Sequence, residues 1–170
     1  SASEPKSLLR LVQSKENQLQ LIIPQLELSK KMAGSSGQAT VTEGLNALFN
    51  LLYNFLDYDD DILVYGLPRI APVVVKYKIT FFHEERIKKK VNMLHIYNHN
   101  AQERIKFLNT FAHTKAKYLP AKYDSQTSTF VCGDKVAFVM WEPLTVITIE
   151  NKNMAVSYKN YFKLLWKDAD

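Results

Sequence analysis

The sequence is poor in the residues that mark many common sites. Its 170 residues include one cysteine, Cys132, so no disulfide can form within the chain, and no spacing of Cys and His resembles a zinc site. The five glycines are scattered, which excludes a glycine-rich phosphate-binding loop. No apolar run reaches the roughly 18 residues that a membrane-spanning helix needs, and no secretory signal stands out. We therefore expect a cytoplasmic protein with no metal, no cofactor and no membrane contact.

Apolar residues, by contrast, are abundant. They make up 46% of the chain, enough for the core of one compact domain with an appendage. The net charge is +5, and much of the excess lies at 86–90 and at Lys115, Lys117 and Lys122. Such an excess can indicate a nucleic acid or an anionic ligand. We interpret 88–90 instead as the solvated last turn of a helix, where cations offset the helix dipole.

Residues 1–33 predict a helical dimerisation stalk. Apolar side chains recur with alternating gaps of four and three, which is the heptad spacing of a coiled coil. The positions of this seam are Leu8, Val12, Lys15, Leu19, Ile22 and Leu26. The partner of the seam is either the rest of this chain or a second copy of the helix, and we favour a homodimer through residues 5–30. The stretch 33–37, rich in Gly and Ser, then marks a boundary.

Residues 38–170 predict an α/β domain with a mixed sheet, parallel at its core and flanked by helices. We expect strands near 38–41, 62–66, 91–97 and 116–119, and helices near 45–56, 73–90 and 98–108. Strands separated by helices favour parallel pairing. The last third, 130–166, predicts a three-strand meander closed by an amphipathic helix that Asn151 or Asn153 caps. Within it, Cys132 is expected to be a small buried apolar residue.

Ligands of open α/β sheets bind outside the carboxyl ends of the strands. The ends predicted here carry Glu43, Tyr65, Gly66, Asn98 and the pair at 141–142. Carboxylate and amide groups for hydrogen bonds, rings for stacking and a glycine that allows close approach suit a polar, hydroxyl-rich ligand. The alternative is a helix cap at Glu43, a turn at Gly66 and solvated tips elsewhere.

Arg86 is a further candidate, because it lies on a helix face otherwise directed at the core. We expect Val74, Tyr77 and Phe81 on that inner face, with Phe82 as a further candidate. A buried arginine is usually paired with a carboxylate, here from Glu43 or Glu142, but it can also hold an anionic ligand through two hydrogen bonds. The predicted effector-binding set is Glu43, Tyr65, Gly66, Arg86 and Asn98. In this set Glu43 and Asn98 bond hydroxyl groups, Tyr65 stacks, and Arg86 orients Glu43 or holds an anion.

A catalytic hypothesis rests on His113 and Lys115. Together with Thr114 they match the first half of the His-x-Lys signature of phospholipase D-type enzymes, but the Asp that should follow is missing from 116–120. A nucleophilic histidine of this kind also needs a second copy to act as acid, and none is present. We therefore predict that the protein is not an enzyme. A phospholipase D-type phosphodiesterase and a protein-interaction module without a small ligand remain as alternatives.

Several stretches resemble one family of regulators. They are Glu43-Gly44, Tyr65-Gly66, Arg86-Ile87-Lys88, the four residues from Lys117 to Pro120, Gly133-Asp134-Lys135-Val136-Ala137 and the six residues from Tyr161 to Trp166. Over residues 5–168 the chain is similar to the C-terminal effector domain of TrmB-like transcriptional regulators, which are common in archaea. The resemblance implies a phospholipase D-like fold without the catalytic signature, a dimerising stalk and a small polar effector such as a sugar. It also implies a winged helix-turn-helix ahead of the stalk, through which DNA would be bound.

Overall fold

The computed structural model describes residues 13–25 and 38–170, and the chain divides into two units, Ser1–Gly37 and Gln38–Asp170. In the first unit, residues 13–25 form a helix whose side chains are all exposed. Among them, Leu19 and Ile22 of the predicted seam are 59% and 46% exposed. The outer seam positions, Leu8, Val12 and Leu26, lie outside the described residues. None of the described helices has the length and apolar character needed to cross a membrane.

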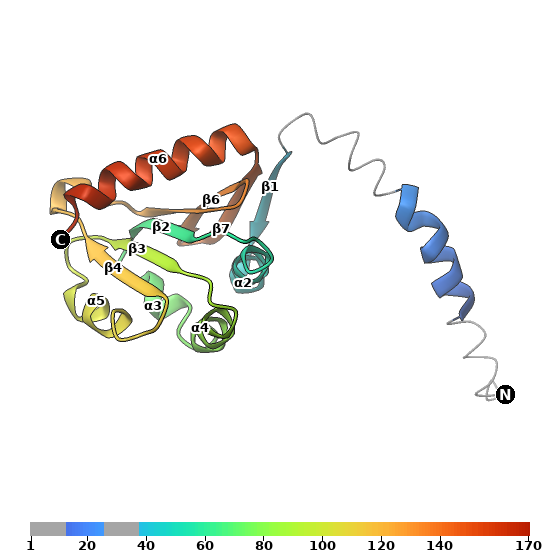
Figure 1. Cartoon of the computed structure of the whole chain (residues 1–170), viewed down its shortest axis with the longest axis horizontal. Helices are drawn as coiled ribbons and strands as arrows, with labels where there is room; N and C mark the ends of the chain where they lie inside the picture. The colour runs from blue at the N-terminus through green and yellow to red at the C-terminus, as the bar shows by residue number, and fades with distance from the viewer. Residues whose placement is uncertain (1–12, 26–37) are drawn as a thin grey trace. The chain divides into compact units, whose positions relative to one another are not determined.

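The second unit is built on a seven-stranded sheet with the strand order β1-β7-β6-β5-β2-β3-β4 (Figure 1). The strands are β1 Gln38–Glu43, β2 Ile62–Leu67, β3 Met93–Tyr97, β4 Thr114–Tyr118, β5 Thr127–Cys132, β6 Lys135–Trp141 and β7 Leu144–Glu150. The helices are α2 Gly44–Phe55, α3 Ala71–Val74, α4 Ile79–Lys88, α5 Gln102–Leu108 and α6 Lys152–Asp168, with a short 3-10 turn η1 at Ala121–Tyr123. The predicted α/β class is confirmed.

The sheet is mixed, with its parallel part confined to β2, β3 and β4. The predicted meander is present as β5, β6 and β7, and it pairs with β2 through β5 in the antiparallel sense. The edge strand β1 runs antiparallel to β7. This arrangement inserts the whole meander between β1 and β2, two strands that are separated by only one helix in the sequence.

Helices cover both faces of the sheet. Figure 1 shows α6 along one face and α3, α4 and α5 beneath the other. Because side chains of a strand alternate between faces, β2 feeds both cores. Ile62 and Val64 belong to the larger core with α2 to α5, whereas Leu63 packs in the smaller core under α6. Two separate cores therefore leave two separate places for a cavity, one on each face.

The C-terminal helix α6 forms as its sequence predicts. The Asn151 side chain accepts a hydrogen bond from the Met154 backbone N–H at 3.0 Å, which caps the first turn. Along the helix, Ala155 and Phe162 are buried, and the apolar side chains of Tyr158, Leu165 and Trp166 pack around them. Spacings of three and four residues place these side chains on one face, so the helix lies flat against the sheet.

The long helix predicted at 73–90 is wrong, since the structure has two shorter helices, α3 and α4. Pro72 starts α3, and the β-branched valines that follow it weaken a continuous helix. The break changes which side of α4 faces the core. Tyr77 and Phe81, expected inside, are 83% and 66% exposed, whereas Phe82 is fully buried.

The hairpin between β5 and β6, which includes the resembling stretch Gly133-Asp134-Lys135-Val136-Ala137, has a structural role. Gly133 takes a φ of +58°, and a Cβ placed there would lie 2.1 Å from the Tyr58 ring. The Tyr58 hydroxyl donates to Asp134 Oδ1 at 2.7 Å, and Lys135 Nζ donates to Asn54 Oδ1. The glycine thus allows the turn to lie against the end of α2, and its neighbours fasten it there.

Candidate functional site

Three of the predicted site residues come together at the carboxyl ends of β2 and β3. A pocket of about 170 Å³ lies there, which we call the edge pocket. Its lining is Tyr65, Gly66, Ile96, Tyr97, Asn98, Leu119, Tyr123, Ser125, Thr127, Thr129 and Leu165. Leu119, Tyr123 and Ser125 come from the loop between β4 and β5, which returns across the strand ends. Two adjacent parallel strands and one returning loop thus build the pocket, at the position expected for ligands of such sheets.

Gly66 allows the returning loop to approach β2. Its φ is +72°, and a Cβ at this position would lie 2.9 Å from the Thr127 carbonyl oxygen and 3.1 Å from Ser125 Cβ. The Gly66 carbonyl in turn accepts a hydrogen bond from Ser128 Oγ at 3.1 Å. A larger residue would push the loop outward, so the glycine sets the depth of the pocket.

Asn98 holds the same loop and does not offer its amide to a ligand. Its Nδ2 donates to the Ser125 carbonyl at 2.8 Å, and its Oδ1 accepts from the Ser125 backbone N–H at 3.2 Å. The prediction that Asn98 bonds ligand hydroxyl groups gains no support from this geometry, because both ends of the amide are already paired. Nearby, His99 Nδ1 lies 2.5 Å from Asp124 Oδ2, a second tie between the end of β3 and this loop.

Tyr65 supplies the pocket with a ring and a hydroxyl. Its ring centroid lies 6.3 Å from that of Phe162 on α6. Burial raises the pKa of Tyr65 to about 12, an effect that a hydrogen bond with Thr129 partly offsets, so the phenol stays protonated near neutral pH. The predicted stacking residue is therefore at the pocket, half-buried between the sheet and α6.

The edge pocket is uncharged and carries several hydroxyl groups on a largely apolar surface. Among the described residues that line it, none is charged, and hydroxyl groups come from Tyr65, Tyr123, Ser125, Thr127 and Thr129. Such a surface matches a neutral ligand that carries hydroxyl groups and an apolar ring face. Sequence analysis did not assign residues 121–128 to the site. The Tyr, Ser and Thr residues that follow Pro120 were the sequence feature that could have indicated a hydroxyl-rich pocket.

Glu43 lies away from the edge pocket, so the prediction of one cleft that includes Glu43 is wrong. Strands β7, β6 and β5 lie between β1 and β2, which puts Glu43 about 19 Å from the end of β2 at normal strand spacing. Glu43 is exposed, and it is the N-cap residue of α2 without a side-chain capping bond.

Arg86 lies at the opposite end of the parallel strands, where β3 and β4 begin, and is fully buried. Its Nη1 donates to the backbone carbonyls of Val91 and His113, both at 2.6 Å, and its Nη2 donates to Thr114 Oγ1 at 2.5 Å. Within residues 38–170 no carboxylate accepts from it, so the predicted pairing with Glu43 or Glu142 is wrong. Arg86 instead joins α4 to the amino ends of β3 and β4.

His113, the histidine of the catalytic hypothesis, also lies at the amino ends of the parallel strands. His113 directly precedes β4, takes a φ of +56° and is exposed. Its Nδ1 lies 3.0 Å from Asn92 Oδ1, and Asn92 Nδ2 donates to Asp61 Oδ1 at 3.0 Å. Lys115 is exposed as well. An amide in place of a carboxylate beside the imidazole gives no strong base or acid partner for nucleophilic catalysis.

Comparison of the sequence with protein-family models and with curated proteins gives no match. Solved structures do match. NucT from Helicobacter pylori aligns with a TM-score of 0.60 at 12% identity, over 79% of this chain and 98% of its own. Nuc from Salmonella typhimurium, a phospholipase D family member, aligns with a TM-score of 0.56 at 11% identity, over 79% of this chain and 97% of its own. The fold is phospholipase D-like.

A third solved structure that matches is that of TrmBL2, an archaeal chromatin protein whose structure shows a novel mode of DNA binding. It aligns with a TM-score of 0.57 at 16% identity and covers 97% of this chain. The chain spans 64% of the length of TrmBL2. At these identities the likeness to all three proteins concerns the fold.

Proposed function

We propose that this chain is the ligand-sensing and dimerisation part of a TrmB-like transcriptional regulator and that it has no catalytic activity. The observation that carries the proposal is the edge pocket, which is uncharged, rich in hydroxyl groups and placed where sheets of this kind bind ligands. The expected effector is a neutral, hydroxyl-rich molecule such as a sugar. Tyr65 would stack on its apolar face, and the hydroxyl groups of the lining would bond to it.

The extent of the structural matches supports the relation to TrmB-like regulators. The alignments with NucT and Nuc cover 79% of this chain, about the length of the domain from β1 to α6. The alignment with TrmBL2 covers 97% and so takes in the N-terminal segment too. A stalk would be a segment of this kind, N-terminal to the shared fold. DNA would then be bound through a winged helix-turn-helix preceding the stalk, and effector binding would change the spacing of two such units.

A screen by thermal shift tests the sensing proposal. Neutral mono- and disaccharides are expected to raise the melting temperature of the chain in a saturable way, because ligand that binds only the folded state stabilises it. Charged analogues, such as sugar phosphates and uronic acids, are expected to bind more weakly, since the edge pocket offers no counter-charge. A preference for the phosphorylated sugars would contradict the proposed ligand class.

The absence of catalysis is tested with a chromogenic phosphodiester. We expect no turnover of bis(4-nitrophenyl) phosphate above the background of buffer, because among the described residues His113 pairs with the neutral amide of Asn92, which separates it from Asp61. The assay should compare the wild-type chain with His113→Ala over the same pH range. Turnover by the wild type that His113→Ala removes would support the phosphodiesterase alternative instead.

Dimerisation through the stalk gives a further prediction. Leu19→Lys combined with Ile22→Lys places two charges in the proposed seam and is expected to convert a dimer into a monomer in sedimentation equilibrium. The matched control is Gln13→Lys with Gln20→Lys, which adds the same charge outside the seam and should leave the dimer intact. A wild-type chain that sediments as a monomer at high concentration would contradict the proposed homodimer through residues 5–30.

A further inference from the structure

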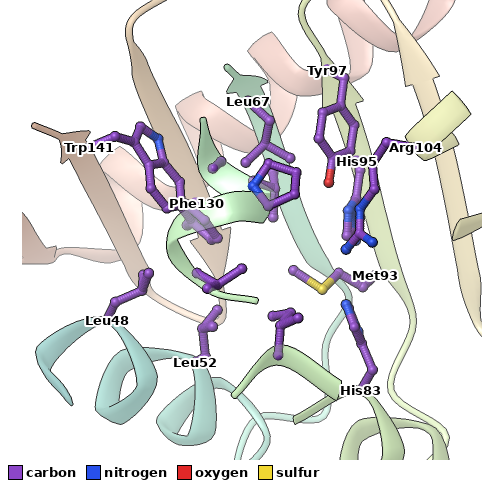
Figure 2. A pocket seen from close by; sticks show the side chains of 15 residues that line it. Leu48, Leu52, Leu67, His83, Met93, His95, Tyr97, Arg104, Phe130 and Trp141 are labelled. Atoms are coloured by element: carbon purple, nitrogen blue, oxygen red, sulfur yellow. The ribbon is translucent and has the colours of Figure 1, made fainter. Parts of the chain in front are cut away.

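A second cavity lies on the other face of the sheet from Tyr65, between the sheet and helices α2, α3 and α4. Its volume is about 40 Å³, and we call it the inner cavity. Figure 2 shows two unlike walls. Leu48, Leu52, Phe130 and Trp141 form an apolar wall, and His83, Met93, His95, Tyr97 and Arg104 lie across from them. The surface of the cavity is mainly apolar, and its few polar groups lie on one side, which favours a mainly apolar occupant with one polar group.

His95 is the clearest sign that something polar belongs in the inner cavity. It is 3% exposed, and neither ring nitrogen has a hydrogen-bond partner among the described residues. Burial, with further contributions from His83, Arg86 and Arg104, holds the pKa of His95 well below its usual value, so the ring is neutral. A neutral imidazole has one donor and one acceptor, and buried polar groups rarely remain unpaired.

Arg104 determines the charge of the expected occupant. It comes from α5, its Nε is buried without a hydrogen-bond partner, and within residues 38–170 it forms no ion pair with a carboxylate. Figure 2 shows its side chain beside His95 on the polar wall, with the Tyr97 hydroxyl directed into the same space. Burial raises the pKa of Tyr97, an effect that the charge of Arg104 and a hydrogen bond with it partly offset, so the phenol stays protonated. A guanidinium together with neutral donors favours an anion over a metal cation.

Access from solvent is through an outer cleft of about 500 Å³. Pro72, Tyr97 and Arg104 line both this cleft and the inner cavity, so the two spaces meet at these side chains. The cleft also carries Arg69 and Glu103, whose opposite charges offset each other, so Arg104 gives the route a net positive charge. An anion would therefore meet one arginine at the surface and the next at the entrance to the cavity.

We propose that the inner cavity binds a short-chain carboxylic acid of about the size of propionate. Its carboxylate accepts hydrogen bonds from Arg104, Tyr97 and the N–H of His95, and its alkyl group lies against Leu52, Met93 and Trp141. The volume sets the size, because a buried water needs roughly 10–15 Å³ of such space and about three would fill it. Water or a phosphate would satisfy the polar groups but would leave the apolar wall without an apolar partner. The site is distinct from the edge pocket, which lies mainly on the other face, but the two share Tyr97.

The two tryptophans provide a built-in probe and control. Trp141 lines the inner cavity, whereas Trp166 stacks on Phe162 under α6. Titration of the ¹⁵N-labelled chain with sodium propionate, against sodium chloride at equal ionic strength, is expected to move the Trp141 indole N–H signal to saturation. The Trp166 signal should stay in place. We expect a dissociation constant below about 10 mM, within the limit for so few heavy atoms, and weaker binding of hexanoate.

Two variants test the contacts. Arg104→Gln is expected to weaken propionate binding at least about tenfold, because it removes the charged donor. Ala71→Leu should block the site by filling the inner cavity from α3, and Lys106→Gln, an exposed position on the same helix as Arg104, should change nothing. An unchanged Trp166 signal reports that each variant is folded. Shifts that grow linearly with propionate, shifts equal at both indoles, or binding that survives both Arg104→Gln and Ala71→Leu would overturn the proposal.

Discussion

Replacing Arg86 by leucine is expected to lower the free energy of unfolding by about 4 kcal/mol. The guanidinium makes three short hydrogen bonds, to the carbonyls of Val91 and His113 and to Thr114 Oγ1. Leucine would leave the Val91 carbonyl without its side-chain donor and the His113 carbonyl with only the Met93 backbone N–H, and it would also remove the donor to Thr114 Oγ1. Losing a charged hydrogen bond costs about 1.5–3 kcal/mol, and the three share one side chain, so they do not simply add.

Urea unfolding followed by far-ultraviolet circular dichroism measures this loss. Lys88→Leu is the matched control, because it removes a cation from an exposed position of the same helix and should change stability by less than about 0.5 kcal/mol. Arg86→Lys should fall between the two, since an ammonium cannot reproduce the planar fork of donors. A loss below about 1 kcal/mol for Arg86→Leu would contradict the bracing role of Arg86 and would return the residue to the list of ligand contacts.

Lowering the pH from 7 to 5 is expected to cost about 4 kcal/mol of stability through His83 and His95 alone. Burial, then the charges of Arg86 and Arg104, lowers the pKa of His83 to about 3, and the pKa of His95 also lies well below its usual value. In the unfolded chain both rings take up protons near pH 6.5, whereas in the folded chain they do not. The unfolded state therefore binds more protons below pH 6.5, and stability falls with pH by about 2 kcal/mol for each ring.

Comparing the stability of histidine variants with that of the wild type separates the loss caused by the two histidines from the loss caused by carboxylates. His95→Phe should remove about half of the expected loss between pH 7 and pH 5, and His83→Phe with His95→Phe should remove nearly all of it. Between pH 7 and pH 8.5 both rings are neutral in both states, so the variants and the wild type should show parallel stability curves there. A wild-type curve and a double-variant curve that stay parallel down to pH 5 would contradict the burial of neutral imidazoles.

The parts of the fold that depend on local sequence were predictable. The stripe of α6 and its Asn151 cap, the strands of the meander and the buried Cys132 follow from side-chain spacing within a few residues. The division of 73–90 into α3 and α4 was missed, because apolar residues continue through the break and only Pro72 and the valines oppose a continuous helix. In such a stretch, the spacing of apolar residues does not show which side chains face the core and which face solvent.

The candidate site was predictable only where neighbouring strands are also neighbours in the sequence. Tyr65, Gly66 and Asn98 meet because β2 and β3 are adjacent and parallel. Glu43 lies at the same edge of the sheet but beyond the inserted meander, and no local pattern reveals strand order. The role of Asn98 was hidden for a similar reason, since its partner Ser125 lies 27 residues further along the chain. Long-range pairing is set by the whole fold, which explains these misses.

Calorimetry with the best sugar from the screen tests the central claim most directly, by comparing Tyr65→Leu with Glu43→Ala. If the edge pocket is the sensing site, Tyr65→Leu should weaken binding at least about tenfold, because it removes both a stacking ring and a hydroxyl. Glu43→Ala should leave the affinity unchanged, since three strands lie between Glu43 and the edge pocket. Unchanged affinity in Tyr65→Leu, with or without a loss in Glu43→Ala, would contradict the account.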